Sequence, residues 1–362
     1  MKVAIIHDYL NQYGGAEKVL EAMHEIWPEA PIFTLFYDPK KMPPHFQKWD
    51  IRVSPISNLP FGTSHYRVYL PLMPAAIERF NLSDYDLVIS SSSAYAKGVL
   101  IHKGCLHFCY CHTPTRYLWS DTFDYIENLS GFEKYFKKIL PVLLTYLRIW
   151  DENASKRPDY FIANSRFVGE RIKKYYHRES EVIYPPVEID KFYISPKIEN
   201  YFLLVSRFRP YKKIDLAINV FNELGIPLKI IGTGNDKYLK KIAGPNIEFL
   251  GNLTDEEKAK YFSKAQALIH PQEEDFGITP LEAMASGRPV IAYRAGGALE
   301  TIVEGLTGEF FYPQTKKALA KVVSSFEVKK YDPQKIRDYA QKFSKERFKG
   351  ELINFINKRI KK

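Results

Sequence analysis

The sequence contains no apolar run long enough to cross a lipid bilayer. The longest candidate covers only residues 139–147, whereas a spanning helix needs about 20 residues. Residues 1–6 lead directly into an apolar run and lack the layout of a signal peptide. We therefore expect a cytoplasmic protein, whose contact with the inner face of a membrane would be peripheral.

Cysteine is almost absent as well, which leaves little basis for disulfides or zinc sites. The three cysteines, Cys105, Cys109 and Cys111, lack the C-x2-C spacing of a zinc site. We expect three reduced, mostly buried thiols. A D-x-D string over residues 84–86 is a pattern that can hold a cation, but it precedes a predicted strand and so lies at the wrong end of the sheet. We predict neither a bound metal nor another cofactor.

Acidic residues are scarce near the end of the chain. The formal net charge is +10, and the last fifty residues, with 15 basic and 5 acidic side chains, account for the whole excess. A basic segment of this kind suits an anionic membrane surface or nucleic acid, but it can equally be a solvated helix face. No nucleic-acid-binding motif accompanies it, so we expect no nucleic-acid partner.

Short apolar runs alternate with amphipathic segments along the chain, and the pattern starts twice. Such alternation predicts parallel sheets covered by helices on both faces. A stretch rich in Pro and charge at residues 185–200 separates the two series. We therefore predict an α/β protein with two Rossmann-like, doubly wound domains, over residues 1–190 and 200–339. The carboxyl ends of both sheets would line a ligand cleft.

The most informative local pattern is a pair of carboxylates, Glu274 and Glu282, on either side of a predicted helix start. Residues 267–270 form an apolar, strand-like run, and Thr279 followed by Pro280 is typical of the first residues of a helix. Strand, loop and helix N-terminus together expose backbone N–H groups that suit a phosphate. Two other interpretations remain open. Thr279 and Glu282 also have the spacing of a capping box, and the acidic stretch around Glu274 is compatible with a solvated loop.

Other loops follow predicted strands and would face the same cleft. The glycine pair at 14–15 allows close approach to a ligand, or a tight turn. His112 ends a strand, where it can bond a hydroxyl group or lie bonded to backbone at the core edge. Arg207 and Lys212 can converge on one diphosphate, or belong to a solvated basic loop. The Gly-Thr-Gly sequence at 232–234 predicts a third close-approach loop.

Taken together, these motifs resemble those of the retaining glycosyltransferases of family 4, which have the two-domain GT-B fold. Residues 274–282 are similar to the E-x7-E motif of that family. The basic pair within 207–212 matches its Arg and Lys, although Ser206 replaces the usual Gly. Residues 14–17 match the glycine loop of the N-terminal domain, and residues 296–300 match a loop that is common after a later strand.

The resemblance implies a role for each of these positions. Glu274 would lie near the donor sugar and its developing positive charge, and His112 would contact a sugar hydroxyl group, so these two are the implied catalytic residues. A nucleotide-sugar donor would bind mainly to the second domain, and no metal is implied. The residues implied in donor binding are Gly15, Arg207, Lys212, Phe276, Gly277, Ile278, Thr279 and Glu282.

The implied substrates are less sharply defined. Residues 5–10 and 111–119 are similar to stretches of bacterial mannosyltransferases of surface-polysaccharide synthesis, which implies GDP-mannose and a glycan or lipid-linked acceptor. The alternatives are a UDP-sugar-dependent transferase of the same fold, a nucleotide-sugar epimerase, and a non-enzymatic basic protein that binds membranes or nucleic acid. The fold also implies that a terminal helix, at about 340–362, returns to the first domain. The basic-apolar stretch at 135–140 is a second candidate for membrane contact.

Overall fold

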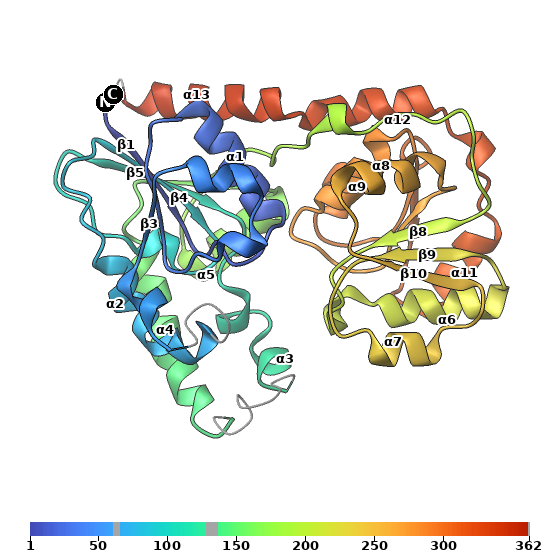
Figure 1. Ribbon diagram of the computed structural model, residues 1–362, viewed down its shortest axis with the longest axis horizontal. Helices are drawn as coiled ribbons and strands as arrows, with labels where there is room; N and C mark the ends of the chain where they lie inside the picture. Colours follow the sequence, from blue (N-terminus) through green and yellow to red (C-terminus); the bar gives the residue numbers. More distant parts are fainter. Residues whose placement is uncertain (61–65, 128–136, 361–362) are drawn as a thin grey trace. The chain divides into compact units, whose positions relative to one another are not determined.

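The computed structural model describes residues 1–60, 66–127 and 137–360, which divide into two compact units (Figure 1). Unit 1 comprises Met1–Tyr184 together with Lys349–Lys362, and unit 2 comprises Pro185–Phe348. The break after Tyr184 coincides with the start of the stretch rich in Pro and charge. Each unit is an α/β structure with its own parallel sheet.

Unit 1 is built on a seven-stranded parallel sheet with the order β3-β2-β1-β4-β5-β6-β7. The three central strands are buried along nearly their whole length, which favours apolar residues in them, although β4 ends in three serines. The strands are β1 (Val3–His7), β2 (Ile32–Thr34), β3 (Ile51–Val53), β4 (Leu87–Ser92), β5 (Leu106–Cys111), β6 (Tyr160–Ala163) and β7 (Ser180–Val182).

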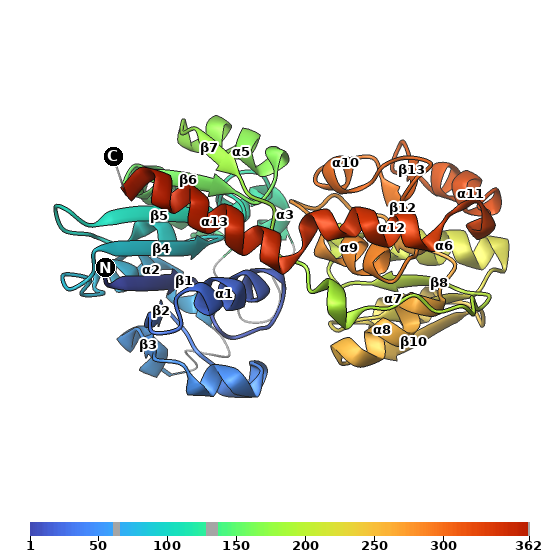
Figure 2. The same ribbon diagram turned by 90° about the horizontal axis from the view of Figure 1, so that it is seen from above.

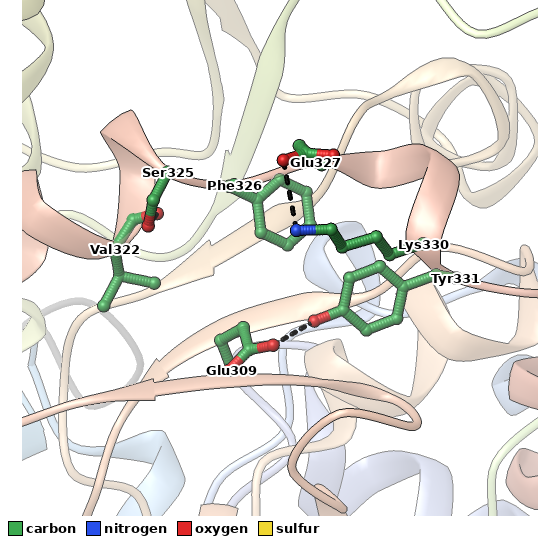
Figure 3. Close-up of a pocket in the computed structure, with 7 residues that line it drawn as sticks. All are labelled: Glu309, Val322, Ser325, Phe326, Glu327, Lys330 and Tyr331. Carbon is green, nitrogen blue, oxygen red and sulfur yellow. Dashed lines mark hydrogen bonds and ion pairs between the residues drawn. The ribbon is translucent and has the colours of Figure 1, made fainter.

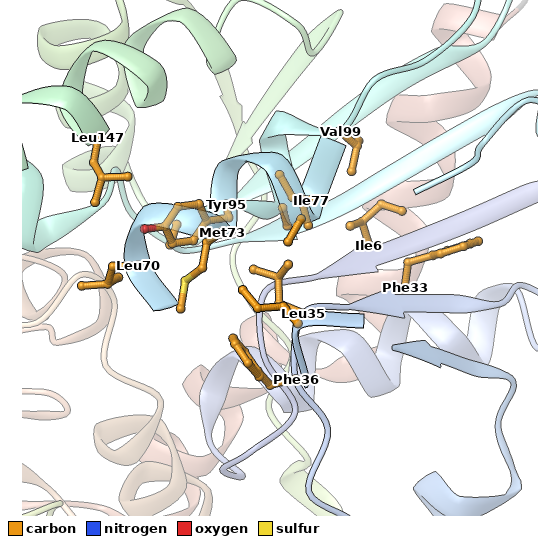
Figure 4. Close-up of a cluster of buried hydrophobic side chains, with 14 of the residues drawn as sticks. Ile6, Phe33, Leu35, Phe36, Leu70, Met73, Ile77, Tyr95, Val99 and Leu147 are labelled. Carbon is orange, nitrogen blue, oxygen red and sulfur yellow. The ribbon is translucent and has the colours of Figure 1, made fainter. Parts of the chain in front are cut away.

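One hydrophobic cluster joins this sheet to two helices of unit 1, α2 and α4 (Figure 4). Ile6 of β1 and Phe33 of β2 meet Met73 and Ile77 of α2, and Leu147 of α4 belongs to the same cluster. The apolar run at 139–147, too short to span a membrane, therefore forms part of a core helix. The helices are α1 (Gly15–Ile26), α2 (Met73–Glu78), α3 (Thr122–Glu127), α4 (Leu140–Ala154) and α5 (Arg166–Tyr176).

The three cysteines are free and buried in unit 1, as predicted. Cys109 and Cys111 alternate on β5 and share a second hydrophobic cluster with α5. Burial raises the pKa of the Cys109 thiol to about 12. A thiol with such a pKa is a poor nucleophile at neutral pH, so these side chains act as core residues.

Unit 2 has a six-stranded parallel sheet with the order β10-β9-β8-β11-β12-β13. Figure 1 shows α6, α7 and α11 on one face of this sheet and α8, α9 and α12 on the other. The strands are β8 (Phe202–Val205), β9 (Leu228–Ile231), β10 (Ile247–Gly251), β11 (Leu268–His270), β12 (Val290–Tyr293) and β13 (Gly308–Phe311). The helices are α6 (Ile214–Leu224), α7 (Lys237–Ile242), α8 (Asp255–Lys264), α9 (Ile278–Ala285), α10 (Ala298–Thr301), α11 (Lys316–Ser324) and α12 (Pro333–Ala340).

Each sheet reverses its winding direction once, and these two points position the candidate site residues. In unit 1 the reversal lies between β1 and β4, and in unit 2 it lies between β8 and β11. Loops that leave the carboxyl ends of such neighbouring strands run to opposite faces of the sheet and leave a ligand-binding crevice. A ligand-binding site is therefore expected at the loops that follow β1, β4, β8 and β11.

The terminal helix predicted at about 340–362 begins later than expected, because the first residues of that range end a separate helix and form a turn. Helix α12 ends at Ala340, a single turn of 3-10 helix follows at Gln341–Phe343, and α13 then covers Lys345–Ile360. Ser344 has extended backbone angles, which interrupts the helical hydrogen bonds. Within unit 1, α13 packs on the sheet (Figure 2): the Phe355 ring lies 5.9 Å from that of Phe108 on β5.

Among the described residues, no helix is both long and apolar enough to span a membrane. The stretch proposed for membrane contact at 135–140 lies partly outside the described residues, because the description resumes at Lys137. The D-x-D string precedes β4, as predicted, and the Asp86 carboxylate accepts a hydrogen bond from the Lys2 backbone at 2.7 Å.

Candidate active site

In unit 2, the loops after β8 and β11 meet through an ion pair. The loop after β8 turns at Pro210, which begins a single 3-10 turn over Pro210–Lys212. This turn carries Lys212 back, so that its Nζ donates a hydrogen bond to Oε1 of Glu274 in the loop after β11. The two side chains are only 12% and 20% exposed. Arg207 lies in the same loop with an exposed side chain.

Glu274 is also linked to a buried histidine at the end of β11. The Gln272 Nε2 atom lies 3.2 Å from Oε1 of Glu274 and 3.2 Å from Nδ1 of His270. Burial, with a smaller contribution from Lys212, lowers the pKa of His270 to about 3. Its other ring nitrogen, Nε2, is buried and has no hydrogen-bond partner among the described residues. The carboxylate thus sits in a largely dehydrated polar cluster where charges interact strongly.

Helix α9 begins two residues earlier than its sequence suggests. Gly277, with a φ of 92°, is the N-cap residue, and Ile278 and Thr279 are the first two helical residues. The prediction that Thr279 caps the helix is therefore wrong, and so is the capping-box interpretation, because Glu282 is the fifth helical residue. The left-handed backbone at Gly277, which glycine adopts without strain, moves the start. The backbone N–H groups of Ile278 and Thr279 still belong to the first turn, which lacks internal acceptors.

The remaining predicted residues of unit 2 are buried against this loop. Glu282 is 5% exposed and lies on α9, one turn beyond its start. Phe276 is 3% exposed, and its ring lies 5.9 Å from that of Phe343. Phe276 therefore fixes the loop between Glu274 and α9 through its side chain, so only its backbone could face a ligand.

Two glycine-containing loops, at Gly232 and Gly297, pack closely against the loops that carry Arg207 and Glu274. Gly297 N donates to Glu274 O at 2.9 Å, and a Cβ atom at Gly297 would lie 2.4 Å from the Phe276 backbone. A Cβ atom at Gly232 would lie 1.8 Å from the carbonyl oxygen of Ser206. The close approach that the structure shows at residues 232–234 is to the loop that carries Arg207, and the predicted approach to a ligand stays a prediction.

In unit 1, the predicted residues lie beside the reversal between β1 and β4. Gly15 is the first residue of α1, after Gly14 as the N-cap. His112 follows β5 directly and is 9% exposed. Its backbone carbonyl accepts a hydrogen bond from Nδ2 of Asn164 at 2.9 Å. The alternative of a histidine ring bonded to backbone does not hold, because the ring nitrogen Nε2 bonds to the side-chain hydroxyl of Ser91.

A chain of buried polar side chains connects His112 to α1. Its Nε2 lies 2.8 Å from the hydroxyl of Ser91 on β4, and this hydroxyl lies 3.0 Å from Nδ1 of His7 on β1. The His7 Nε2 is 3.5 Å from the carboxylate of Glu17, which follows the glycine pair. Burial, and to a smaller extent His7, lowers the pKa of His112 to about 3, so its ring is neutral at physiological pH.

The loop after His112 is held by a second buried polar cluster, centred on Asp151 of α4. Its carboxylate accepts hydrogen bonds from Lys97 at 2.5 Å, and from Thr115, Trp119 and Tyr176 at 2.8 Å each. Lys97 and Asp151 are each 1% exposed. All four donors converge on one carboxylate, so this ion pair is satisfied and fixes the loop over residues 113–119.

The sequence therefore predicts which loops carry the site residues better than it predicts which side chains those residues contact. Lys212 and Glu274 are brought together, and the other predicted residues of unit 2 lie on the same two loops and on α9. Sequence reasoning missed His7, Ser91 and Glu17 in unit 1, and His270 and Gln272 in unit 2. One sequence signal could have identified two of them. His7 and His270 are polar residues at the ends of apolar strands, and His112 directly follows such a strand.

A pocket of about 310 Å³ lies elsewhere in unit 2 (Figure 3). It is lined by residues of β13, of the last turn of α11 and of the segment that follows α11. The Tyr331 hydroxyl donates to Glu309 at 2.5 Å and Lys330 pairs with Glu327 at 3.1 Å, so these polar groups bond to one another. None of the predicted site residues lines it: its members are Glu309, Val322, Ser325, Phe326, Glu327, Lys330 and Tyr331.

Family models match nearly the whole chain. The model described as Glycosyltransferase Family 4 matches residues 13–191, and the model described as Glycosyl transferases group 1 matches residues 188–343. The two matched ranges correspond closely to the two series of strands and helices.

Similar sequences include an uncharacterized glycosyltransferase and a mannosyltransferase. The first, from Methanocaldococcus jannaschii, is 28% identical over 212 residues, which cover 55% of this chain and 60% of the relative. The second, the alpha-1,3/1,6-mannosyltransferase alg2 of Schizosaccharomyces pombe, is 24% identical over 390 residues, which cover 89% of this chain and 73% of the relative. The match to the archaeal relative thus spans less than two thirds of that protein.

Solved glycosyltransferase structures share the fold over the full chain. HepE of Anabaena, in complex with UDP and glucose, superimposes with a TM-score of 0.75 at 18% identity and covers 99% of both chains. Sucrose-phosphate synthase from Thermosynechococcus elongatus gives a TM-score of 0.75 at 17% identity, again over 99% of both chains. This likeness shows the GT-B fold, and the two family matches show that the chain belongs to family 4 of the glycosyltransferases.

Proposed function

We propose that this chain is a retaining glycosyltransferase that moves mannose from GDP-mannose to a glycan or lipid-linked acceptor, without a metal ion. The bond between the anomeric carbon and the diphosphate oxygen breaks, and its electron pair leaves with the diphosphate. The acceptor hydroxyl oxygen bonds to the same face of that carbon and gives its proton to the departing phosphate oxygen. Unit 2 would hold the donor, and unit 1 would serve the acceptor side.

The contact between Lys212 and Glu274 is the observation that carries this proposal. Departure of a diphosphate from a sugar develops negative charge on the phosphate and positive charge on the sugar carbon. A cation and a carboxylate held side by side in a dehydrated site can stabilise both charges. The first turn of α9 adds backbone N–H groups that suit phosphate. Arg207 and Lys212 would supply the positive charge that a divalent metal supplies in other sites.

The mannosyl part of the proposal is supported by the relatives. The fission-yeast relative, which matches most of this chain, is an alpha-1,3/1,6-mannosyltransferase. The HepE structure contains UDP and glucose, but at 18% identity it informs only on the fold. GDP-mannose is therefore the donor that we would test first, with UDP-sugars as the competing class.

Binding of nucleotides in the absence of an acceptor tests the donor directly. Thermal shift would be measured with GDP, UDP and ADP and with their sugars. We expect stabilisation by GDP and GDP-mannose, because a ligand that binds only the folded state raises the melting temperature. A shift confined to UDP and its sugars would replace mannosyl transfer with the UDP-dependent alternative.

Product analysis tests the chemistry. Donor turnover would be followed with and without EDTA, and free sugar, epimerised sugar and glycoside would be separated. Glu274→Gln should abolish turnover, whereas Glu273→Gln, which alters the exposed neighbouring carboxylate, should retain it. Loss of turnover with EDTA would contradict metal independence, and an epimerised nucleotide sugar without acceptor would favour the epimerase.

Peripheral contact with an anionic membrane is a second element of the proposal, and it is supported by α4. One face of this helix enters the core through Leu140, Leu144 and Leu147. The opposite face carries a second apolar stripe: Ile139, Val142, Tyr146 and Ile149 are 54–73% exposed. A surface helix with apolar side chains on both faces is unusual in water. The exposed Lys137 and Lys138 before it suit anionic lipid headgroups.

The apolar side chains of α13 cannot make this contact, because Phe348, Leu352, Phe355 and Ile356 are buried. Sedimentation with vesicles of anionic phospholipid tests α4 directly. Tyr146→Glu should reduce vesicle binding severalfold, whereas Tyr238→Glu, at a similarly exposed tyrosine of α7, should not. Equal binding by both variants would exclude α4 as the contact.

A further inference from the structure

The polar chain in unit 1 runs along the carboxyl edge of the sheet, through its reversal point. His7 and Ser91 are aligned partners on the neighbouring strands β1 and β4, and His112 follows β5, the next strand. Glu17 reaches the chain from the first turn of α1. His7, Ser91 and Glu17 are each at most 3% exposed, so water has little access to these groups.

When His7 is neutral, only one arrangement of protons satisfies the hydrogen-bond donors and acceptors of this row of polar side chains. A carboxylate only accepts hydrogen bonds, so Glu17 requires a proton on Nε2 of His7. The Nδ1 atom of His7 is then an acceptor and takes the hydroxyl proton of Ser91. The Ser91 oxygen is left to accept, and it does so from Nε2 of His112 at 2.8 Å. The proton of His112 is thereby placed on Nε2.

We propose that Glu17, His7 and Ser91 are positioning residues that hold His112 with its proton on Nε2, so that Nδ1 accepts a hydrogen bond from a hydroxyl group of the bound sugar. This inference rests on the proposed function. Among the described residues, none hydrogen-bonds Nδ1 of His112. A neutral imidazole with one nitrogen committed to Ser91 presents the other as a fixed acceptor.

The fixed tautomer decides which group of the substrate His112 can recognise. With the proton on Nε2, the ring accepts from a hydroxyl group; with the proton on Nδ1, it would donate instead, and would suit a carbonyl or phosphate oxygen. A second contact fixes the backbone of the same residue, because Nδ2 of Asn164 donates a hydrogen bond to the His112 carbonyl oxygen at 2.9 Å. Both contacts come from strands or strand ends, which are rigid supports for a site.

Ser90 offers a matched control on the same strand. Its hydroxyl lies 2.8 Å from Nε2 of His107, and both residues are fully buried. Burial also lowers the pKa of His107 to about 3. This pair has the same chemistry as Ser91 and His112, but it does not contact the row of polar side chains that leads to Glu17 on α1. Ser90→Ala therefore removes an equivalent hydrogen bond without touching His112.

The tautomer can be read by nitrogen NMR on the full chain labelled at histidine, without substrate. The signals of His112 would be assigned from their loss in His112→Asn. We expect wild-type protein and Ser90→Ala to show protonated Nε2 and unprotonated Nδ1 at His112, and Ser91→Ala to show a mixture of tautomers. A proton on Nδ1 in the wild-type protein, or an unchanged tautomer in Ser91→Ala, would overturn the proposal.

Turnover then separates this inference from the proposed function. We expect Ser91→Ala to lower kcat about tenfold with little change in GDP binding, and Ser90→Ala to keep kcat near the wild-type value. Equal kcat values for Ser91→Ala and the wild-type enzyme would show that the fixed tautomer does not serve the reaction. If the wild-type chain transfers no sugar, the proposed function fails, while the NMR result still decides the tautomer.

Discussion

Lys212 and Glu274 neutralise each other at a place where neither is well hydrated. Breaking such a pair by removing one partner leaves a charge without compensation, which is costly. Under the proposed function, the Lys212 ammonium also has to serve the donor diphosphate. The same side chain therefore links the electrostatics of the free protein to the binding of its substrate.

Replacement of Lys212 tests that link at the scale of one residue. We expect Lys212→Met to weaken GDP binding about 10- to 100-fold, the loss typical of a hydrogen bond to a charged group. Lys213→Met is the control, because Lys213 is exposed in the same loop. Calorimetric titration of both variants with GDP gives the comparison. Equal affinities would place the diphosphate away from Lys212.

At the scale of elements, the loops after β9 and β12 act as supports. Residues 232–234 lie against the loop that carries Arg207, and Gly297 lies against the backbone of Phe276. The sequence predicted that the backbone at these glycines approaches another group closely, but it did not predict which group. A glycine pair that touches a neighbouring loop has the same local sequence as one that touches a phosphate.

Two glycines with helical backbone angles should respond in opposite ways to alanine. At Gly297, whose φ is −62°, a Cβ atom would lie 2.4 Å from the Phe276 backbone, and overpacking of this kind costs about 1–3 kcal/mol. At Gly350 in α13 nothing lies within 4 Å, so alanine should stabilise by about 0.5–1 kcal/mol. Urea unfolding of Gly297→Ala and Gly350→Ala measures both. A Gly297→Ala variant as stable as the wild-type protein would contradict the close packing of the Gly297 loop.

Much of the fold was predictable because the buried strands are nearly continuous apolar runs bounded by turn residues. The start of α9 was not, since its cap depends on the left-handed backbone at Gly277 and not on the better capping side chain of Thr279. The contact between Ser91 and His7 joins residues 84 positions apart, so it follows from strand register, which local sequence does not contain. Lys212 and Glu274 were predicted as separate ligands, and only the turn at Pro210 brings them together.

At the scale of the whole molecule, buried neutral histidines are distributed unevenly between the two units. Burial lowers the pKa values of His107 and His112 in unit 1, and of His270 in unit 2, to about 3. In the unfolded chain each titrates near ~6.5. Below that pH the unfolded chain binds protons that the folded chain does not. The stability from these groups is therefore complete above pH ~6.5 and is lost as the pH falls toward 3.

This distribution predicts that unit 1 unfolds first on acidification. Each such histidine lowers the free energy of unfolding by about 1.4 kcal/mol per pH unit below ~6.5, and unit 1 contains two of them. All four tryptophans, Trp27, Trp49, Trp119 and Trp150, lie in unit 1, so tryptophan fluorescence reports on that unit alone. We expect its transition at a higher pH than the final loss of helical circular dichroism. His270→Gln should leave the fluorescence midpoint unchanged, and coincident transitions in the wild-type protein would show that the units do not differ in acid stability.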